Sequence, residues 1–150
     1  VTMSGLRTAV PLDFTTGQAT LVIPQAPDDA VSSSFYILDE VPIASFGLGF
    51  TITSTELRAE ELAEGSVNVL GTTPLFRGAF PGELIIRTDG ERLHLVAASD
   101  GFVGAEIELH DRPLPPGITN TYFNFVADAD VGVGFGGSMR ADSIEICPSL

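Results

Sequence analysis

Hydrophobic and polar residues alternate along much of this chain, and the alternation is clearest over residues 83–111. This stretch holds three apolar-rich runs, which Asp89-Gly90 and Asp100-Gly101 separate from one another. An Asp-Gly pair favours a tight hairpin turn because both residues tolerate positive φ. A period of two, with one apolar and one polar face, is typical of antiparallel strands that cover a core. The stretch therefore predicts a three-stranded meander.

The same period predicts where the polar side chains of the meander point. In the third run, Glu106, Glu108 and His110 alternate with apolar residues such as Leu109, and in the second run His94 lies between two leucines. We expect all four polar side chains on the solvent face of the sheet. Neither histidine can form a zinc site without carboxylates as further ligands.

Further apolar runs predict strands on both sides of the meander. They cover residues 10–14, 19–23, 34–38, 44–53, 66–70, 119–127 and 139–147. In the run 44–53, four large apolar residues alternate with polar residues and two glycines. Those glycines indicate a bulge or the close approach of another backbone. Residues 53–65 predict the one short helix, since Thr53 and Glu56 have capping-box spacing and Gly65 is a plausible C-terminal stop, although an acidic loop is an alternative.

These elements predict an all-β fold with at most one short helix. About nine to eleven strands follow one another with turn signals every eight to twelve residues, and no βαβ alternation is present. This pattern indicates a two-sheet antiparallel β-sandwich of the jelly-roll type. A length of 150 residues predicts one domain, over residues 1–150.

The charge and the single cysteine narrow the range of partners. The formal net charge is −13, with seven arginines and no lysine, so nucleic acid and anionic lipid surfaces are excluded as partners. Acidity suits a calcium-rich or salty exterior, although it can also serve solubility alone. Cys147 is the single cysteine of this sequence, and so predicts a free thiol or a disulfide with a cysteine of a neighbouring domain or of another chain. No apolar run approaches the ~18 residues of a membrane span.

Two segments of the chain are similar to the concanavalin A-like and laminin G-like sandwich families. Residues 82–101 (GELIIRTDGERLHLVAASDG) resemble the meander of these families with its Asp-Gly turn. Residues 132–146 (GVGFGGSMRADSIEI) resemble their closing block, with the Phe-x-Gly step at 135–138. The resemblance implies an extracellular or cell-surface module that binds glycans or proteins, often with one Ca²⁺ at a rim.

Two kinds of binding site are candidates. Ca²⁺ prefers six to eight oxygen ligands, and Asp128 and Asp130 lie two residues apart in a glycine-rich turn that Asp100 could complete. An ordinary polar turn explains the same residues. A glycan site needs an aromatic platform flanked by planar polar groups. The candidates for it are Tyr122, Asn124, Arg87, Arg92 and His94.

Catalysis has two possible signatures, both of which the sequence disfavours. Glu106 and Glu108 would lie about 7 Å apart on one strand, which suits a solvated sheet face better than a glycosidase pair. Residues 55–58 (TELR), His94 and Tyr122 follow the order of three motifs in a jelly-roll alginate lyase family, to which they show a resemblance.

The sequence favours a noncatalytic extracellular module that is carbohydrate-binding or adhesive, with Ca²⁺ as its candidate cofactor. The first alternative is a structural or self-assembling subunit that uses an exposed edge strand and Cys147. The second is a polysaccharide lyase or hydrolase.

Overall fold

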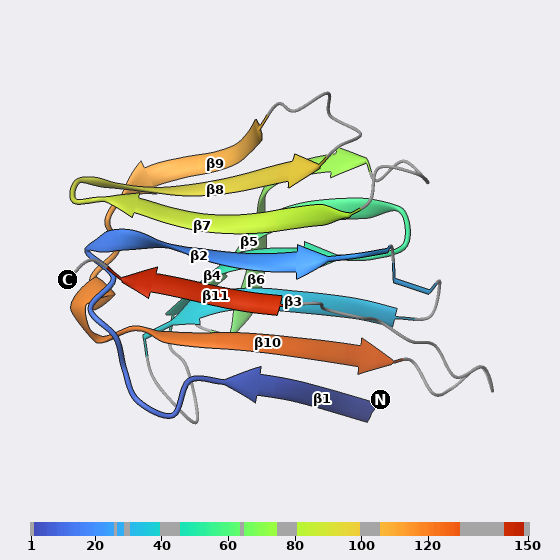
Figure 1. The fold of residues 1–150 in the computed structure, drawn as a ribbon, viewed down its shortest axis with the longest axis horizontal. Coiled ribbons are helices and arrows are strands. Elements are labelled where there is room, and N and C mark those ends of the chain that lie inside the picture. Colours follow the sequence, from blue (N-terminus) through green and yellow to red (C-terminus); the bar gives the residue numbers. More distant parts are fainter. Residues whose placement is uncertain are drawn as a thin grey trace.

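In the part of the chain that the structure describes, the computed structural model has eleven β-strands in two antiparallel sheets and one short 3₁₀ turn, η2 (Ile118–Asn120) (Figure 1). The structure describes residues 2–25, 27, 28, 31–39, 46–63, 65–74, 81–99, 106–129 and 143–148. The six-stranded sheet has the order β1 (Thr2–Arg7), β10 (Tyr122–Ala129), β3 (Val31–Leu38), β4 (Phe46–Ile52), β5 (Glu56–Ala63) and β6 (Ser66–Pro74). The five-stranded sheet has the order β11 (Ser143–Pro148), β2 (Thr16–Ile23), β7 (Gly82–Asp89), β8 (Arg92–Ser99) and β9 (Glu106–Pro113).

The fold class and the meander are confirmed. Strands β7, β8 and β9 pair in sequence as antiparallel neighbours. At the first turn, the Asp89 carboxylate accepts hydrogen bonds from the backbone N–H groups of Glu91 and Arg92, at 3.0 and 2.8 Å, and Gly90 has φ 97°. Aspartate and glycine therefore supply the turn chemistry that the sequence predicts.

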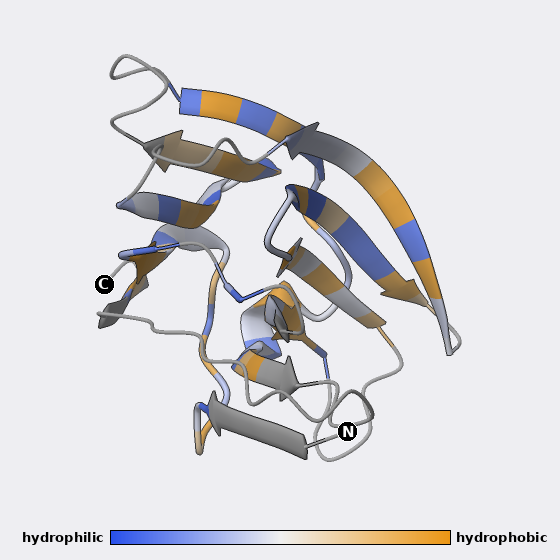
Figure 2. Ribbon diagram, turned by 90° about the vertical axis from the view of Figure 1, so that its right-hand side faces the viewer, coloured by the Kyte–Doolittle hydropathy of each residue, from blue (hydrophilic) through white to orange (hydrophobic). Residues whose placement is uncertain are grey.

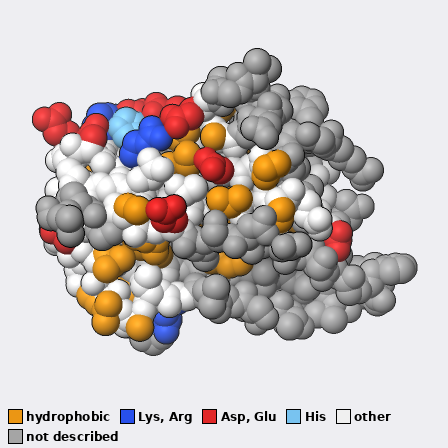
Figure 3. Space-filling view, viewed as in Figure 1, with side chains coloured by type: hydrophobic (Ala, Val, Ile, Leu, Met, Phe, Trp, Pro, Cys, Tyr) orange, Lys and Arg blue, Asp and Glu red, His pale blue; other side chains and the backbone are white. Residues whose placement is uncertain are grey.

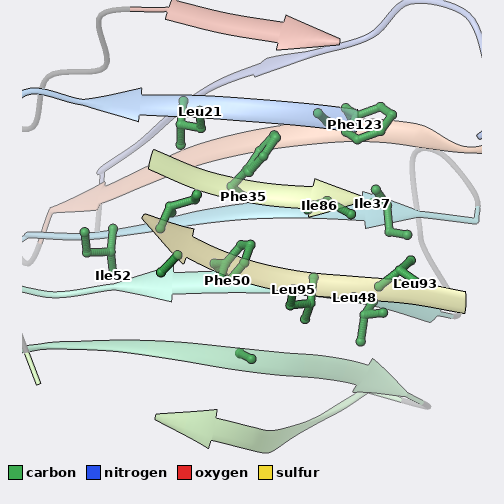
Figure 4. Close-up of a cluster of buried hydrophobic side chains, with 14 of the residues drawn as sticks. Leu21, Phe35, Ile37, Leu48, Phe50, Ile52, Ile86, Leu93, Leu95 and Phe123 are labelled. Carbon is green, nitrogen blue, oxygen red and sulfur yellow. The ribbon is translucent and has the colours of Figure 1, made fainter. Parts of the chain in front are cut away.

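The core lies between the two sheets. Alternate residues of β2, β3, β4, β7 and β8 face inward, and Figure 2 shows hydrophilic and hydrophobic positions alternating along strands. Figure 4 shows the inward side chains of β2, β3, β4, β7, β8 and β10 gathered in one cluster. Phe14 packs edge-to-face on Phe123 with ring centroids 4.9 Å apart. Burial of each large side chain contributes roughly 1.5–3 kcal/mol to folding.

The prediction of a helix over residues 53–65 is wrong, because Glu56–Ala63 form strand β5 between β4 and β6. Thr53 and Glu56 do interact, but in the turn between β4 and β5. The Thr53 N–H donates to the Glu56 carbonyl at 2.9 Å, and the Glu56 N–H donates to Thr53 Oγ1 at 3.2 Å. Two flanking strands supply hydrogen bonds and a core, which outweigh the helix propensity of Ala, Leu and Glu.

A bulge changes the expected alternation in β9. The register pairs Leu95 with His110 and Val96 with Glu108, so one extra residue, Leu109, enters β9. Cross-strand partners share a face of the sheet. His110 therefore lies on the same face as the buried Leu95 and is half-buried, and its predicted solvent-facing position is wrong. His94 keeps the outer face.

The two edges of the sandwich differ. Strands β6 and β9 meet at one edge, where a Cβ atom on Gly71 would lie 2.3 Å from the Leu109 carbonyl oxygen. At the other edge lies an apolar pocket of about 180 Å³, whose lining residues are Phe35, Phe123, Phe125, Ile146, Asn124, Arg7 and Thr8. Strand β1 lies at this edge, where the sequence predicted no strand. No helix among the described residues is long and apolar enough to cross a membrane.

Candidate functional site

Polar side chains converge on the outer face of the six-stranded sheet, the face that points away from the core. One row of the register crosses the whole sheet, and it contains Arg7, Asn124, Tyr36, Gly49, Glu60 and Val69. Tyr36 on β3 and Glu60 on β5 belong to strands that are not neighbours, because β4 runs between them. Gly49 of β4 is the residue between the two side chains.

The absence of a side chain at Gly49 allows Tyr36 to reach across β4. The Tyr36 hydroxyl donates a hydrogen bond to Glu60 Oε2 at 2.6 Å. A Cβ atom on Gly49 would lie 2.0 Å from the Phe35 carbonyl oxygen and 2.7 Å from Tyr36 Cα. Glycine is therefore required here by a close backbone approach, as the sequence indicated for this strand.

Thr51 and Ser34 extend this hydrogen-bond network. Thr51 Oγ1 donates to the same Glu60 Oε2 at 2.8 Å, and it lies 3.0 Å from the Tyr36 hydroxyl and 3.2 Å from Ser34 Oγ. A hydroxyl has one hydrogen to donate. Because Tyr36 and Thr51 both use theirs on the carboxylate, Ser34 is the donor to Thr51. We call these four residues the Glu60 network.

The network lies on the outer face of a sheet, and its carboxylate and phenol are nevertheless buried, whereas Ser34 and Thr51 are half-buried. Glu60 is 5% exposed and Tyr36 is 6% exposed. Burial raises the pKa of the Tyr36 phenol well above its usual range, and the hydrogen bond to Glu60 raises that pKa further. Tyr36 therefore stays protonated and acts as a donor that fixes the carboxylate.

More accessible polar and apolar groups surround the Glu60 network. Arg58 follows the same face of β5 and forms an ion pair with Glu56. Asn124 and Tyr122 are half-buried on β10, in the rows of Tyr36 and Leu38 respectively. On β6, Val67 and Val69 are more than half exposed. The face thus combines a fixed carboxylate, a guanidinium, an amide, a phenol ring and apolar side chains.

The structure divides the five predicted glycan-binding residues between two opposite faces. Tyr122 and Asn124 lie on the six-stranded sheet, whereas Arg87, Arg92 and His94 lie on the outer face of the five-stranded sheet. Figure 3 shows this second face, with acidic, basic and histidine side chains together over β8 and β9. The two groups cannot contact one small ligand.

Each of the three residues on the second face contacts a carboxylate. Arg87 Nη2 and Nη1 donate to the two oxygens of Glu106 at 2.8 and 3.2 Å. Arg92 Nε lies 2.8 Å from Asp111 Oδ2. His94 Nδ1 lies 2.8 Å from Glu108 Oε2. Glu106 and Glu108 thus belong to a solvated, ion-paired sheet face.

The predicted order of lyase motifs does not form one site. Arg58 and Tyr122 lie on the outer face of the six-stranded sheet, but His94 lies on the opposite side of the sandwich. Among the predicted calcium ligands, Asp128 lies on β10 opposite Ser32 and Met3. Asp100 and Asp130 lie outside the described residues. Cys147 is exposed on β11, and its hydrogen bond to Glu145 raises the pKa of its thiol.

Sequence reasoning missed the Glu60 network. Tyr36, Thr51 and Glu60 are separated by 9 to 24 positions in the chain, and Glu60 falls within residues 53–65, for which the sequence predicts a helix. The signal that could have found them is the glycine at 49. A glycine between two antiparallel strands leaves room for a long side chain from the neighbouring strand.

No family model matches the chain, and no curated protein matches it. Several solved structures are similar in fold. The laminarinase catalytic domain from Thermotoga maritima has a TM-score of 0.64 at 11% identity, over 97% of this chain and 69% of that chain. Sheep galectin-11 has a TM-score of 0.53 at 12% identity, over 97% and 96%. A xyloglucan GH43B from Bacteroides ovatus has a TM-score of 0.61 at 11% identity, over 89% of this chain.

The chain spans only about a quarter of the Bacteroides ovatus protein, 27% of its length. At these identities the comparisons establish the fold. The chain has a jelly-roll β-sandwich fold, consistent with the concanavalin A-like class, and its structural neighbours include galectins, a laminarinase catalytic domain and an alginate lyase.

Proposed function

We propose that this chain is a noncatalytic carbohydrate-binding module that binds a neutral oligosaccharide on the outer face of its six-stranded sheet. The Glu60 network is the observation that carries the proposal. Two hydroxyl groups hold Oε2 of the carboxylate, and no described residue donates to Oε1. A fixed carboxylate oxygen is a strong acceptor for the hydroxyl groups of a sugar.

The groups around Glu60 fit the rest of a sugar. Asn124 and Arg58 offer planar polar groups on the same face. Tyr122 on β10 and the valines Val67 and Val69 on β6 are four strand spacings apart, about 19 Å, so they offer an aromatic ring and apolar side chains to different sugar units of an oligosaccharide. The net charge of −13 disfavours anionic polysaccharides as ligands. The galectins among the structural neighbours share the fold of this chain.

The described carboxylates on this face do not have the geometry of a glycosidase. Glycosidases use two carboxyl groups roughly 5–9.5 Å apart. Glu56 and Glu60 are four residues apart on one strand, which corresponds to about 13 Å between their Cα atoms. In addition, Glu56 is paired with Arg58, and the raised pKa of Tyr36 opposes its use as a base. These facts favour binding over catalysis.

Titration with an array of neutral and anionic oligosaccharides tests the proposal. We expect wild-type protein to bind neutral members, and Glu60→Gln and Asn124→Ala to weaken that binding at least tenfold. Glu106→Gln is the matched control, because Glu106 lies on the opposite face, and it should bind like wild type. Thermal melts establish that each variant is folded.

Two results contradict the proposal. One is that the wild-type protein binds no oligosaccharide of the array. The other is that binding persists in Glu60→Gln and Asn124→Ala but is lost on substitution of Arg87 or Arg92. That second result would place the site on the five-stranded sheet.

The proposal includes an extracellular location and a calcium ion bound by Asp128, Asp130 and Asp100. A thermal melt with millimolar Ca²⁺, against Mg²⁺ and chelator controls, tests the ion. A ligand that binds only the folded state raises the melting temperature. The rise should be specific to Ca²⁺ and absent in Asp128→Asn.

A further inference from the structure

We propose that His94, Glu108 and Asp111 form a binding site for a divalent transition-metal ion of the Zn²⁺ type on the outer face of the five-stranded sheet. One ligand atom from each of these side chains lies within 4.8 Å of the others. The site is on the opposite side of the sandwich from the Glu60 network, and it does not depend on the proposed function.

The bulge in β9 creates this arrangement. Glu108 and Asp111 are three residues apart, so a regular strand would place them on opposite faces. The extra residue at Leu109 changes the register, so that Asp111 pairs with His94 and Glu108 pairs with Val96. His94 and Val96 share the outer face of β8. Both carboxylates therefore come to the same face, Asp111 directly opposite His94 and Glu108 opposite the next outer-face residue of β8.

The donor set indicates the kind of metal. One imidazole nitrogen with two carboxylates suits Zn²⁺ and similar borderline ions, whereas Ca²⁺ prefers oxygen ligands alone. Three protein ligands leave coordination positions for water, as in open zinc sites. His94 Nδ1 lies 2.8 Å from Glu108 Oε2, so the ion takes the place of the proton between these two atoms.

The surrounding residues fit the second shell of a metal site. A ligating histidine usually donates its other N–H to a carboxylate, and His94 Nε2 lies 3.5 Å from Asp89 Oδ2. Asp89 is itself fixed by backbone hydrogen bonds from Glu91 and Arg92. Ligating carboxylates are also commonly hydrogen-bonded. Arg92 contacts Oδ2 of Asp111, so Oδ1 is the oxygen that coordinates the ion.

Calorimetric titration of Zn²⁺ into the protein tests the site. The experiment uses a Cys147→Ser background, because Cys147 is an exposed free cysteine and a thiolate can ligate Zn²⁺ on its own. We expect one saturable site per chain, with affinity at least tenfold lower in His94→Gln, Glu108→Gln or Asp111→Asn. Asp89→Asn should lower it roughly tenfold or more, the magnitude typical of a second-shell change. Glu106→Gln is the matched control and should stay within twofold.

Two further measurements distinguish this site from nonspecific binding to an acidic surface. In ¹⁵N-labelled protein, Zn²⁺ should shift the Nδ1 resonance of His94 far more than Nε2. A hundredfold excess of Ca²⁺ should leave the Zn²⁺ affinity unchanged. The proposal is overturned by the absence of saturable binding, by equal affinity in Glu108→Gln and Asp111→Asn, by ligation through Nε2, or by displacement with Ca²⁺.

Discussion

The outer faces of the two sheets arrange charge in opposite ways. On the six-stranded sheet, Glu60 is buried and shares one carboxylate oxygen between Tyr36 and Thr51. On the five-stranded sheet, Arg87 and Arg92 form ion pairs with carboxylates, and all of these side chains are more than a third exposed. One face has a single desolvated acceptor with fixed donors, and the other has several solvated pairs.

This difference determines how much each polar contact contributes to folding. A buried polar group that loses its partner costs about 1–3 kcal/mol, since water cannot replace that partner. An exposed ion pair contributes about 0–1 kcal/mol, because solvent and salt screen it. The more heavily charged face should therefore matter less to stability than the face with one buried carboxylate.

Gly49→Ala should cause the largest loss of unfolding free energy. The new Cβ atom would lie 2.0 Å from the Phe35 carbonyl oxygen, and backbone cannot move aside as a flexible side chain can. Overpacking in a close-packed region typically costs 1–3 kcal/mol, occasionally more. We expect about 3 kcal/mol or more of lost unfolding free energy in urea denaturation, or failure to fold.

Gly65→Ala is the matched control for this substitution. Gly65 has φ 80°, but a Cβ atom there would have no neighbour within 4 Å. Its cost should be limited to the backbone strain, about 1–2 kcal/mol. If Gly49→Ala cost no more than Gly65→Ala, the close approach of β3 to β4 would not be a constraint, and the room for Tyr36 would need another explanation.

Tyr36→Phe should cause the next largest loss of unfolding free energy. It removes a donor from Glu60 Oε2 and leaves a buried carboxylate with less support, which should cost about 1–3 kcal/mol. The raised pKa of Tyr36 adds a signature that depends on pH. A phenol whose pKa is higher in the folded state stabilises the fold below its unfolded pKa, near 10, and this stabilisation is lost as pH rises further.

Urea denaturation between pH 7 and pH 11 measures both effects. Wild-type stability should fall above about pH 10, and the Tyr36→Phe variant should show a smaller alkaline loss. Combining Tyr36→Phe with Thr51→Val should give a non-additive change, because both hydroxyls share one oxygen. Additive changes would show that the two donors act independently.

The contrast between the faces also explains what could be read from the sequence. Local signals were sufficient for the meander, where Asp89-Gly90 fixes a turn and apolar residues alternate on each side. The sequence predicts a helix in place of strand β5, because the residues of β5 favour a helix. Only the two neighbouring strands make this segment extended. The bulge at Leu109 could not be seen, as one extra residue leaves no mark in composition.

The candidate sites also divide into features that local sequence signals predict and features that depend on which strands are neighbours. Alternation over residues 119–127 is sufficient to put Tyr122 and Asn124 on the same face of their strand, because it requires only local order. The Glu60 network joins three strands across two registers, and no local pattern specifies which strands are neighbours. The predicted glycan-binding residues also lie on two different faces, with Arg87, Arg92 and His94 on one and Tyr122 on the other. This separation depends on which sheet each strand joins, and the local sequence does not determine that topology.

Glu106→Gln should cause the smallest loss of unfolding free energy. Glu106 pairs with Arg87, and the hydrogen bond from Arg87 lowers the pKa of this carboxyl below its usual range. A carboxylate with a lowered folded-state pKa stabilises the fold above its unfolded pKa and loses that effect as pH falls through the folded-state value. Because the pair is exposed, the loss of unfolding free energy at pH 7 should stay below about 1 kcal/mol and shrink further in 1 M salt.

Urea denaturation at low and high salt measures this loss and its dependence on salt. A loss as large as that of Tyr36→Phe, insensitive to salt, would mean that this ion pair is shielded from solvent, and the distinction between the two faces would fail.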